Sequence, residues 1–143
     1  MKGKRYFGIF FICFFIHAMG VSAQTASLEV NVHNIKSHKG SIRVGLFDSE
    51  TDFLKNAVEG KVVKASGREI TVIFENLAPG EYALSVIHDE NENGELDSNA
   101  FGVPKEGFAF GNNAMGPFGP PSFEKAKMKI EGNLQCSITL KYY

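Results

Sequence analysis

The sequence predicts an all-β protein, an antiparallel Greek-key sandwich of about seven strands that is either transthyretin-like or immunoglobulin-like. Short segments alternate apolar and polar residues, turn signals built from Gly, Pro and Asn separate them, and no long helical pattern lies between them. Strands at this spacing without intervening helices are typical of two packed antiparallel sheets. One domain with one core is therefore expected over residues 24–143.

The first residues predict a secretory signal peptide over residues 1–23. Two lysines and an arginine open the chain, residues 7–19 are almost all apolar, and residues 21–23 form a small-x-small cleavage site. The apolar run is short for a membrane span, and no second run follows it. We therefore expect an exported protein, periplasmic or extracellular, that has no membrane span after cleavage.

The net charge argues against some classes of partner, and the cysteine content argues against a disulfide. Residues 24–143 lose three of the 15 basic residues and none of the 16 acidic ones, which leaves 12 against 16 and a net charge near −4. This balance argues against nucleic acid or an anionic membrane surface as partner. Cys136 is the single cysteine in this range, so no intrachain disulfide is expected and the fold must hold by packing.

Seven segments have the alternation or the apolar content of strands, and they span residues 28–32, 41–47, 61–65, 69–74, 82–88, 123–130 and 135–142. Turn residues at 66–68 predict a hairpin between the third and fourth segments, and those at 131–133 predict a closing hairpin between the last two. Only residues 51–58 suggest a helical turn, with Asp48 or Ser49 as its cap.

Tyr82 opens the strongest strand, directly after a Pro79-Gly80 turn. This arrangement resembles the tyrosine corner of Greek-key sandwiches, in which the phenol bonds back to nearby main chain and fixes the crossover between sheets. An ordinary aromatic residue on a strand is the alternative interpretation.

The most informative segment is the acidic loop, residues 89–97, which spaces oxygen-bearing side chains two apart around a glycine. The pattern resembles the first six positions of an EF-hand loop, although Ala100 stands where the bidentate Glu should be. Ca²⁺ takes six to eight hard oxygen ligands. The predicted ligands are the side chains of Asp89, Asn91, Asn93 and Asp97 and the main-chain carbonyl of Glu95.

A plain turn is the alternative for this loop, because Asn, Asp and Gly also dominate turns that hold no metal. Five carboxylates lie within nine residues, however, with no Lys or Arg among them. Such crowding is unfavourable unless a cation or solvent screens it. The composition therefore favours bound Ca²⁺, and it disfavours Mg²⁺, which rarely uses all-protein sites.

Several motifs together resemble a secreted bacterial family of domains of unknown function. They are a Pro-Gly-x-Tyr strand, a His-Asp-x-Asn-x-Asn-Gly-x-x-Asp loop and two later segments, at residues 79–82, 88–97, 102–108 and 120–123. The resemblance implies a small exported protein with no established catalytic activity. The strand motif is also similar to transthyretin-like and carboxypeptidase-regulatory sandwiches, which bears on the fold and leaves function open.

Residues 101–121 form a long connection with five Gly, four Pro and four Phe. Long irregular connections inside compact domains are usually functional or disordered, and disordered segments usually lack aromatic residues. We therefore expect a structured flap beside the acidic loop, with Phe101 and Phe108 covering a sheet face. Phe110 and Phe118 fit that role and a recognition surface equally well.

These features predict a non-catalytic binding or accessory module with a Ca²⁺-stabilised loop that presents the flap to a carbohydrate, a peptide or an envelope protein. His88, Phe110 and Phe118 are the candidate binding residues, although His88 also fits a packed core histidine. Two alternatives remain open. A metal-dependent hydrolase-type enzyme would use the acidic loop and His88 beside an open polar cleft. A structural partner would pair through an uncovered strand edge, such as residues 28–32.

Overall fold

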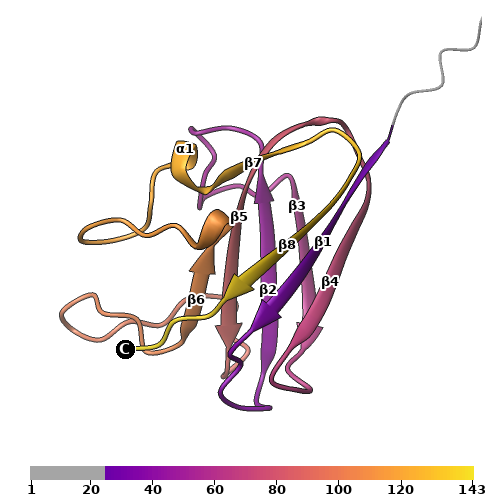
Figure 1. Cartoon of the computed structure of the whole chain (residues 1–143). Coiled ribbons are helices and arrows are strands. Elements are labelled where there is room, and N and C mark those ends of the chain that lie inside the picture. Colours follow the sequence, from indigo (N-terminus) through magenta and orange to yellow (C-terminus); the bar gives the residue numbers. More distant parts are fainter. Residues whose placement is uncertain (1–24) are drawn as a thin grey trace, which may run out of the picture.

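The computed structural model describes residues 25–143, and the predicted signal peptide lies outside them. The described residues form two packed β-sheets (Figure 1), so the predicted all-β sandwich is confirmed. They contain eight strands, against about seven expected, and two very short helical segments. The finer Greek-key and transthyretin-like assignment stays a prediction. Within residues 25–143 no helix has both the length and the apolar character needed to cross a bilayer.

The smaller sheet has three strands, with β1 (Ala26–His33) at its centre between β4 (Ile70–Leu77) and β8 (Asn133–Thr139). β1 pairs with β4 in antiparallel orientation and with β8 in parallel orientation. The sheet is therefore mixed, where an antiparallel one was expected. Residues 28–32 have a paired neighbour on each side, so the uncovered strand edge expected there for a structural partner is wrong.

The larger sheet has the order β3 (Glu59–Lys64), β2 (Ser41–Phe47), β5 (Gly80–Asp89) and β6 (Gly107–Phe110). β7 (Lys127–Ile130) pairs with the first half of β5, on the edge whose second half is taken by β6. β5 is the longest strand described, with 10 residues. It pairs with β2 along residues 83–89 on one side, and with β7 and then β6 on the other. Its last residue carries the chain straight into the acidic loop.

The alternation seen in the sequence builds the core between the two sheets. Leu28, Val30 and Val32 of β1 are fully buried, while the residues between them are half-buried. Residues of the larger sheet that share this core include Ile42, Val44, Leu46, Leu84 and Val86. Burying one such side chain contributes about 1.5–3 kcal/mol, so this core is the main source of stability.

Neither predicted hairpin forms. β3 pairs with β2, whereas β4 pairs with β1 in the opposite sheet, so residues 65–69 carry the chain from one layer to the other. In the same way β7 pairs with β5, and β8 pairs with β1. A turn signal specifies that the chain reverses. Which sheet the next strand joins depends on where its apolar face can be buried.

The tyrosine-corner hydrogen bond is confirmed. The Tyr82 hydroxyl donates to the main-chain carbonyl of Ala78 over 2.8 Å, and the ring is buried. This bond fixes the turn by which the chain leaves β4 in one sheet and enters β5 in the other. Burial also raises the pKa of Tyr82 above its ordinary value, with the charges of Asp48 and Glu59 acting in the same direction.

A second apolar cluster covers the outer face of the larger sheet. Along β6, Ala109 points into the first core, so Phe108 and Phe110 point outward into the second cluster. Its other buried members are Phe47, Ala83 and two residues of the short helix α1 (Phe123–Ala126). The 3-10 turn η1 (Gly111–Asn113) links β6 to the following loop. Part of the outer face of this sheet is therefore covered by a second packed layer, and the groove described below lies in it.

Candidate binding groove and acidic loop

The acidic loop begins at Asp89, the last residue of β5, whose carboxylate is fully buried. One carboxylate oxygen accepts a hydrogen bond from the main-chain N–H of Asn93 (3.2 Å), and the other accepts from that of Gly94 (2.9 Å). The Arg43 guanidinium on neighbouring β2 lies 3.3 Å from the same carboxylate. Asp89 thus folds the loop back on itself, and Gly94 supplies the positive φ of 88° at this return.

The middle of the loop consists of two successive side-chain turns. The side-chain oxygen of Asn91 accepts from the N–H of Asn93 (3.1 Å), and that of Asn93 accepts from the N–H of Glu95 (2.9 Å). Both amide groups also donate to the Asp97 carboxylate, Asn91 over 2.6 Å and Asn93 over 3.2 Å. The predicted ligands Asn91, Asn93 and Asp97 are therefore in direct contact, on a turn that Asp89 anchors.

Glu106 closes the loop, and sequence reasoning missed this role. Its side chain is buried, and its two carboxylate oxygens accept the main-chain N–H groups of Glu90 (2.9 Å) and Asp97 (3.1 Å). One carboxylate therefore bridges the beginning and the end of the loop. The nearest signal in the sequence is its place directly before β6, which gives no indication of burial.

Arg43 is the second residue that sequence reasoning missed. It lies 46 residues before Asp89, so the count of charges within the loop did not include it. Its guanidinium lowers the electrostatic cost of burying Asp89, so one of the five carboxylates of the loop is neutralised by a side chain from outside the loop. Within residues 25–143 no three His, Cys, Asp or Glu side chains converge as a metal group. The predicted set has two carboxylates, two amides and one carbonyl, and Ca²⁺ binding stays a prediction.

His88 is a packed histidine. Its ring is fully buried, Nε2 donates to the Lys39 carbonyl (2.9 Å), and Nδ1 accepts from the Tyr142 hydroxyl (2.8 Å). Because a carbonyl only accepts, this pairing assigns the proton of the neutral ring to Nε2. The open polar cleft beside His88 that the enzyme alternative expected is therefore wrong, and His88 does not reach the groove described next.

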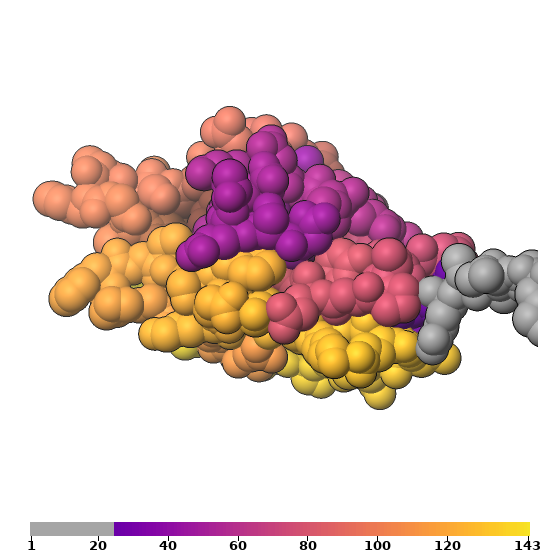
Figure 2. Space-filling model, turned by 90° about the horizontal axis from the view of Figure 1, so that it is seen from above, coloured from indigo at the N-terminus to yellow at the C-terminus, as the bar shows by residue number. Residues whose placement is uncertain are grey.

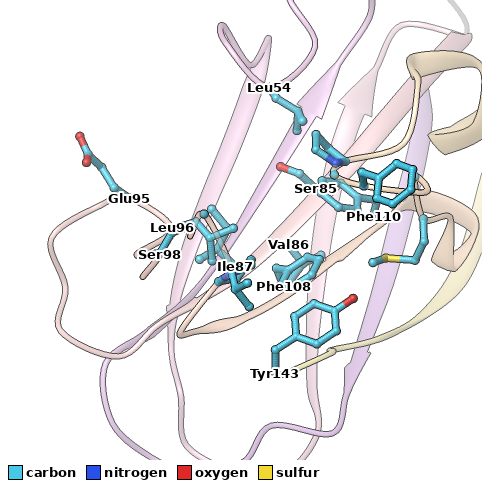
Figure 3. Close-up of a pocket in the computed structure, with 18 of the residues that line it drawn as sticks. Leu54, Ser85, Val86, Ile87, Glu95, Leu96, Ser98, Phe108, Phe110 and Tyr143 are labelled. Carbon is cyan, nitrogen blue, oxygen red and sulfur yellow. The ribbon is translucent and has the colours of Figure 1, made fainter. Parts of the chain in front are cut away.

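A groove of about 840 Å³ lies on the outer face of the larger sheet, beside the acidic loop (Figure 3). Ser85 and Ile87 of β5 line it together with Phe108 and Phe110 of β6. Residues 94–96 of the acidic loop form part of one wall. This volume lies in the range of small-molecule sites, which hold about 300–1,000 Å³. The expectation that the acidic loop and the flap lie at the same end of the fold is confirmed.

The groove is mainly apolar, with few polar side chains. Figure 3 shows Ser85 inside it, between Leu54 and Phe110, whereas the Glu95 carboxylate points away. A Cβ on Gly45 would lie 3.3 Å from the Phe47 ring and 3.4 Å from the Ser85 hydroxyl, so glycine at this position lets both side chains pack close to β2. Among residues 25–143, Lys55 is the single lysine that lines the groove, and no arginine of this range lines it.

Two loops frame the groove and project on one side of the sandwich (Figure 2). The first arm, residues 98–104, is closed by a bridge between Ser98 and Pro104. The second arm, residues 114–121, doubles back so closely that a Cβ on Gly116 would lie 2.6 Å from the carbonyl oxygen of Gly119. Glycine at position 116 is what permits this close return of the chain.

The four phenylalanines of the flap divide into two pairs. Phe108 and Phe110 pack on the sheet with 6% and 7% of their surfaces exposed, which confirms the expectation for Phe108. Phe101 and Phe118 are 92% and 103% exposed, so the prediction that Phe101 covers a sheet face is wrong. Phe110 and Phe118, the two candidate binding residues of the flap, both line the groove.

The fold and the site define a class of protein: an all-β sandwich that carries an apolar groove beside an acidic, hydrogen-bonded loop. The chain belongs to a bacterial family described as an uncharacterized protein conserved in bacteria (DUF2141), whose model matches residues 30–137. Comparison with curated proteins and with solved structures gave no match. The resemblance to a bacterial domain-of-unknown-function family is thereby confirmed, and secretion stays a prediction.

Proposed function

We propose that this protein is an exported, non-catalytic binding module whose groove takes a small apolar ligand. The observation that carries the proposal is the groove itself, an 840 Å³ hollow on a packed sheet face. Phe108 and Phe110 are already packed on the sheet beneath it, so little conformational freedom is lost when a ligand enters. A preformed, mainly apolar hollow with a few polar groups is the usual form of a small-molecule site.

The lining of the groove supports an apolar body with one hydrogen-bonding group as the ligand chemistry. Phe47, Phe108, Phe110 and Met115 offer apolar surface, and the Ser85 hydroxyl offers one donor and acceptor within it. Lys55 adds a single positive charge at the groove, which suits a ligand with an anionic end. A sugar, whose hydroxyls need many partners, fits this lining less well than an aromatic or aliphatic molecule.

We propose that Ca²⁺ supports the wall of this site. Asp89, Asn91, Asn93, Glu95 and Asp97 would hold the ion, and it would add positive charge to a loop with five carboxylates. What supports this assignment is that Asn91, Asn93 and Asp97 lie together on one turn, where a bound ion would replace the two amide N–H groups from which the Asp97 carboxylate accepts. Residues 94–96 belong both to this loop and to the groove wall, so ordering the loop would steady the groove.

The groove is tested with the fluorescent probe 8-anilinonaphthalene-1-sulfonate, which has an apolar body and an anionic end. We expect saturable binding to the folded protein at one site. Ser85→Leu, which fills the hollow with a larger side chain, should weaken this binding at least tenfold. The matched control is Ser137→Leu, because Ser137 is exposed on β8 in the opposite sheet.

Melting curves of both variants accompany the titration, since partly unfolded protein also binds this probe. Absence of saturable binding to the native protein would overturn the proposal. Equal binding by Ser85→Leu and the native protein, with unchanged melting temperatures, would overturn it as well.

A further inference from the structure

We infer that the tips of the two arms dock on a lipid surface. Phe101 on the first arm and Phe118 on the second are almost completely exposed, at 92% and 103%. Figure 2 shows both arms, the salmon and orange segments at the left, projecting beyond the body on the same side. Phenylalanine is normally buried in soluble domains, and neighbouring exposed aromatics mark an interaction surface.

The arms carry no charged side chains, which suits insertion into an apolar medium. Neither residues 98–104 nor residues 114–121 contain a charged side chain, and none occurs anywhere from residue 107 to residue 123. In the whole chain 22% of residues are charged, so the arms differ from the rest of the surface. Charged groups are costly in a bilayer, whereas Phe gains by burial there. A lipid surface is therefore the partner whose chemistry the arms match.

The main chain of the first arm is already hydrogen-bonded at its tip. The side-chain oxygen of Asn99 accepts from the N–H groups of Phe101 (2.9 Å) and Val103 (3.1 Å). The Gly102 N–H donates to the Asn99 carbonyl, and the Asn99 N–H donates to the Val103 carbonyl, both over 2.9 Å. Main-chain groups that enter lipid need partners within the protein, and this turn supplies them.

Two other exposed apolar side chains lie on strands and not on projecting arms. Val62 on β3 and Ile73 on β4 are 57% and 47% exposed. Val62 lies next to Lys61, and both residues belong to regular strands rather than to projecting tips. Single apolar residues on a sheet surface are ordinary. These two positions therefore serve as controls for the loss of an exposed apolar side chain.

The charges beside the arms indicate which lipid is preferred. Glu92 and Glu95, exposed on the acidic loop, precede the first arm, and Lys105 follows it. Negative charge therefore exceeds positive charge next to this tip. We expect binding to zwitterionic vesicles that is not strengthened by anionic lipid, because docking rests on apolar insertion.

The test is flotation of the purified protein with phosphatidylcholine vesicles, alone and with one fifth phosphatidylglycerol. We expect the protein to float with both. Phe101→Ser combined with Phe118→Ser should reduce the partition coefficient at least tenfold, since each lost ring removes about tenfold or more of the partition gain. Val62→Ser combined with Ile73→Ser should leave it unchanged, and melting temperatures verify that both double variants are folded.

Docking of the arm tips does not depend on a ligand in the groove, so Ser85→Leu separates the two proposals. That variant should lose the fluorescent probe and still float. If the native protein floats with neither vesicle, the lipid inference is overturned and the proposed groove is not affected. Flotation that survives the double Phe substitution would also overturn the lipid inference. Self-association through Phe101 and Phe118 without vesicle binding would overturn it as well and would identify a second copy as the partner.

Discussion

His88 shows how one residue joins segments that are far apart in the chain. Its ring nitrogens bond the Lys39 carbonyl, just before β2, and the hydroxyl of Tyr142, beyond the end of β8. The Tyr142 hydroxyl also accepts from the main-chain N–H of Lys36 over 3.2 Å. A buried polar group is stable only when its bonding capacity is used, and here each partner satisfies the other. His88 therefore holds the segment before β2 and the segment after β8 together, next to the start of the acidic loop.

Replacing His88 with Phe should lower the free energy of unfolding by about 1–3 kcal/mol, because the Lys39 carbonyl and the Tyr142 hydroxyl lose their partner in a part-buried site. Tyr142→Phe should cost less: Nδ1 and the N–H of Lys36 lose their partner, but the bond between Nε2 and the Lys39 carbonyl remains, and Lys36 is exposed to solvent. Urea denaturation of both single variants and the double variant measures the coupling. Additive effects of the two substitutions would contradict the shared network.

At the scale of elements, the acidic loop combines local and distant interactions. The side-chain turns of Asn91 and Asn93 are local, and their residue types predict them. The contacts from Arg43 and Glu106 are distant, and no local pattern predicts them. The two predicted hairpins did not form for the same reason: the sheet that the next strand joins depends on distant contacts. The turn residues at 66–68 and 131–133 are local and do not specify it.

Calcium should raise the melting temperature if the loop binds it as proposed. At a free concentration one hundred times the Kd, binding stabilises the folded state by about 2.7 kcal/mol. In a domain of this size, that gain shifts the melting temperature by about 10 °C. Calorimetric titration with CaCl₂ and melting in EDTA provide the measurement. Asp97→Asn should reduce both effects, and Asp48→Asn, outside the loop, serves as the control.

An unchanged melting temperature in EDTA, together with no heat of binding on addition of CaCl₂, would show that the loop is a plain hydrogen-bonded turn. The contacts of Arg43 and Glu106 would then be sufficient to hold it.

At the scale of the whole molecule, stability rests on two apolar layers, one between the sheets and one on the outer face of the larger sheet. Cys136 is free in the described part of the chain and packs against the first layer. Burial raises the pKa of the Cys136 thiol to about 11. Burial also raises the pKa of Tyr82 and of Tyr142 above their ordinary values.

Raised pKa values make the fold sensitive to alkali. The Cys136 thiol ionises near its ordinary value of 9.0 in the unfolded chain and at about 11 in the folded chain. The folded state therefore gains stability from this thiol below pH 9, and the gain is lost as the pH rises through 11. We expect urea denaturation under reducing conditions to show a falling free energy of unfolding over this range. Cys136→Ala should reduce the fall, and an identical fall in that variant would contradict the assignment to the thiol.

The sequence by itself determined the fold class, the Tyr82 bond to the main chain, the inward side of alternating strands such as β1 and the turn-forming character of residues 89–97. These features depend on alternation and on contacts within a few residues, which a linear pattern records. Tertiary structure alone decided the pairing of strands, the place of Arg43 and Glu106 beside the loop, and the outward direction of Phe101. These depend on which apolar faces meet and which charges are buried together, and both arise only when distant segments pack.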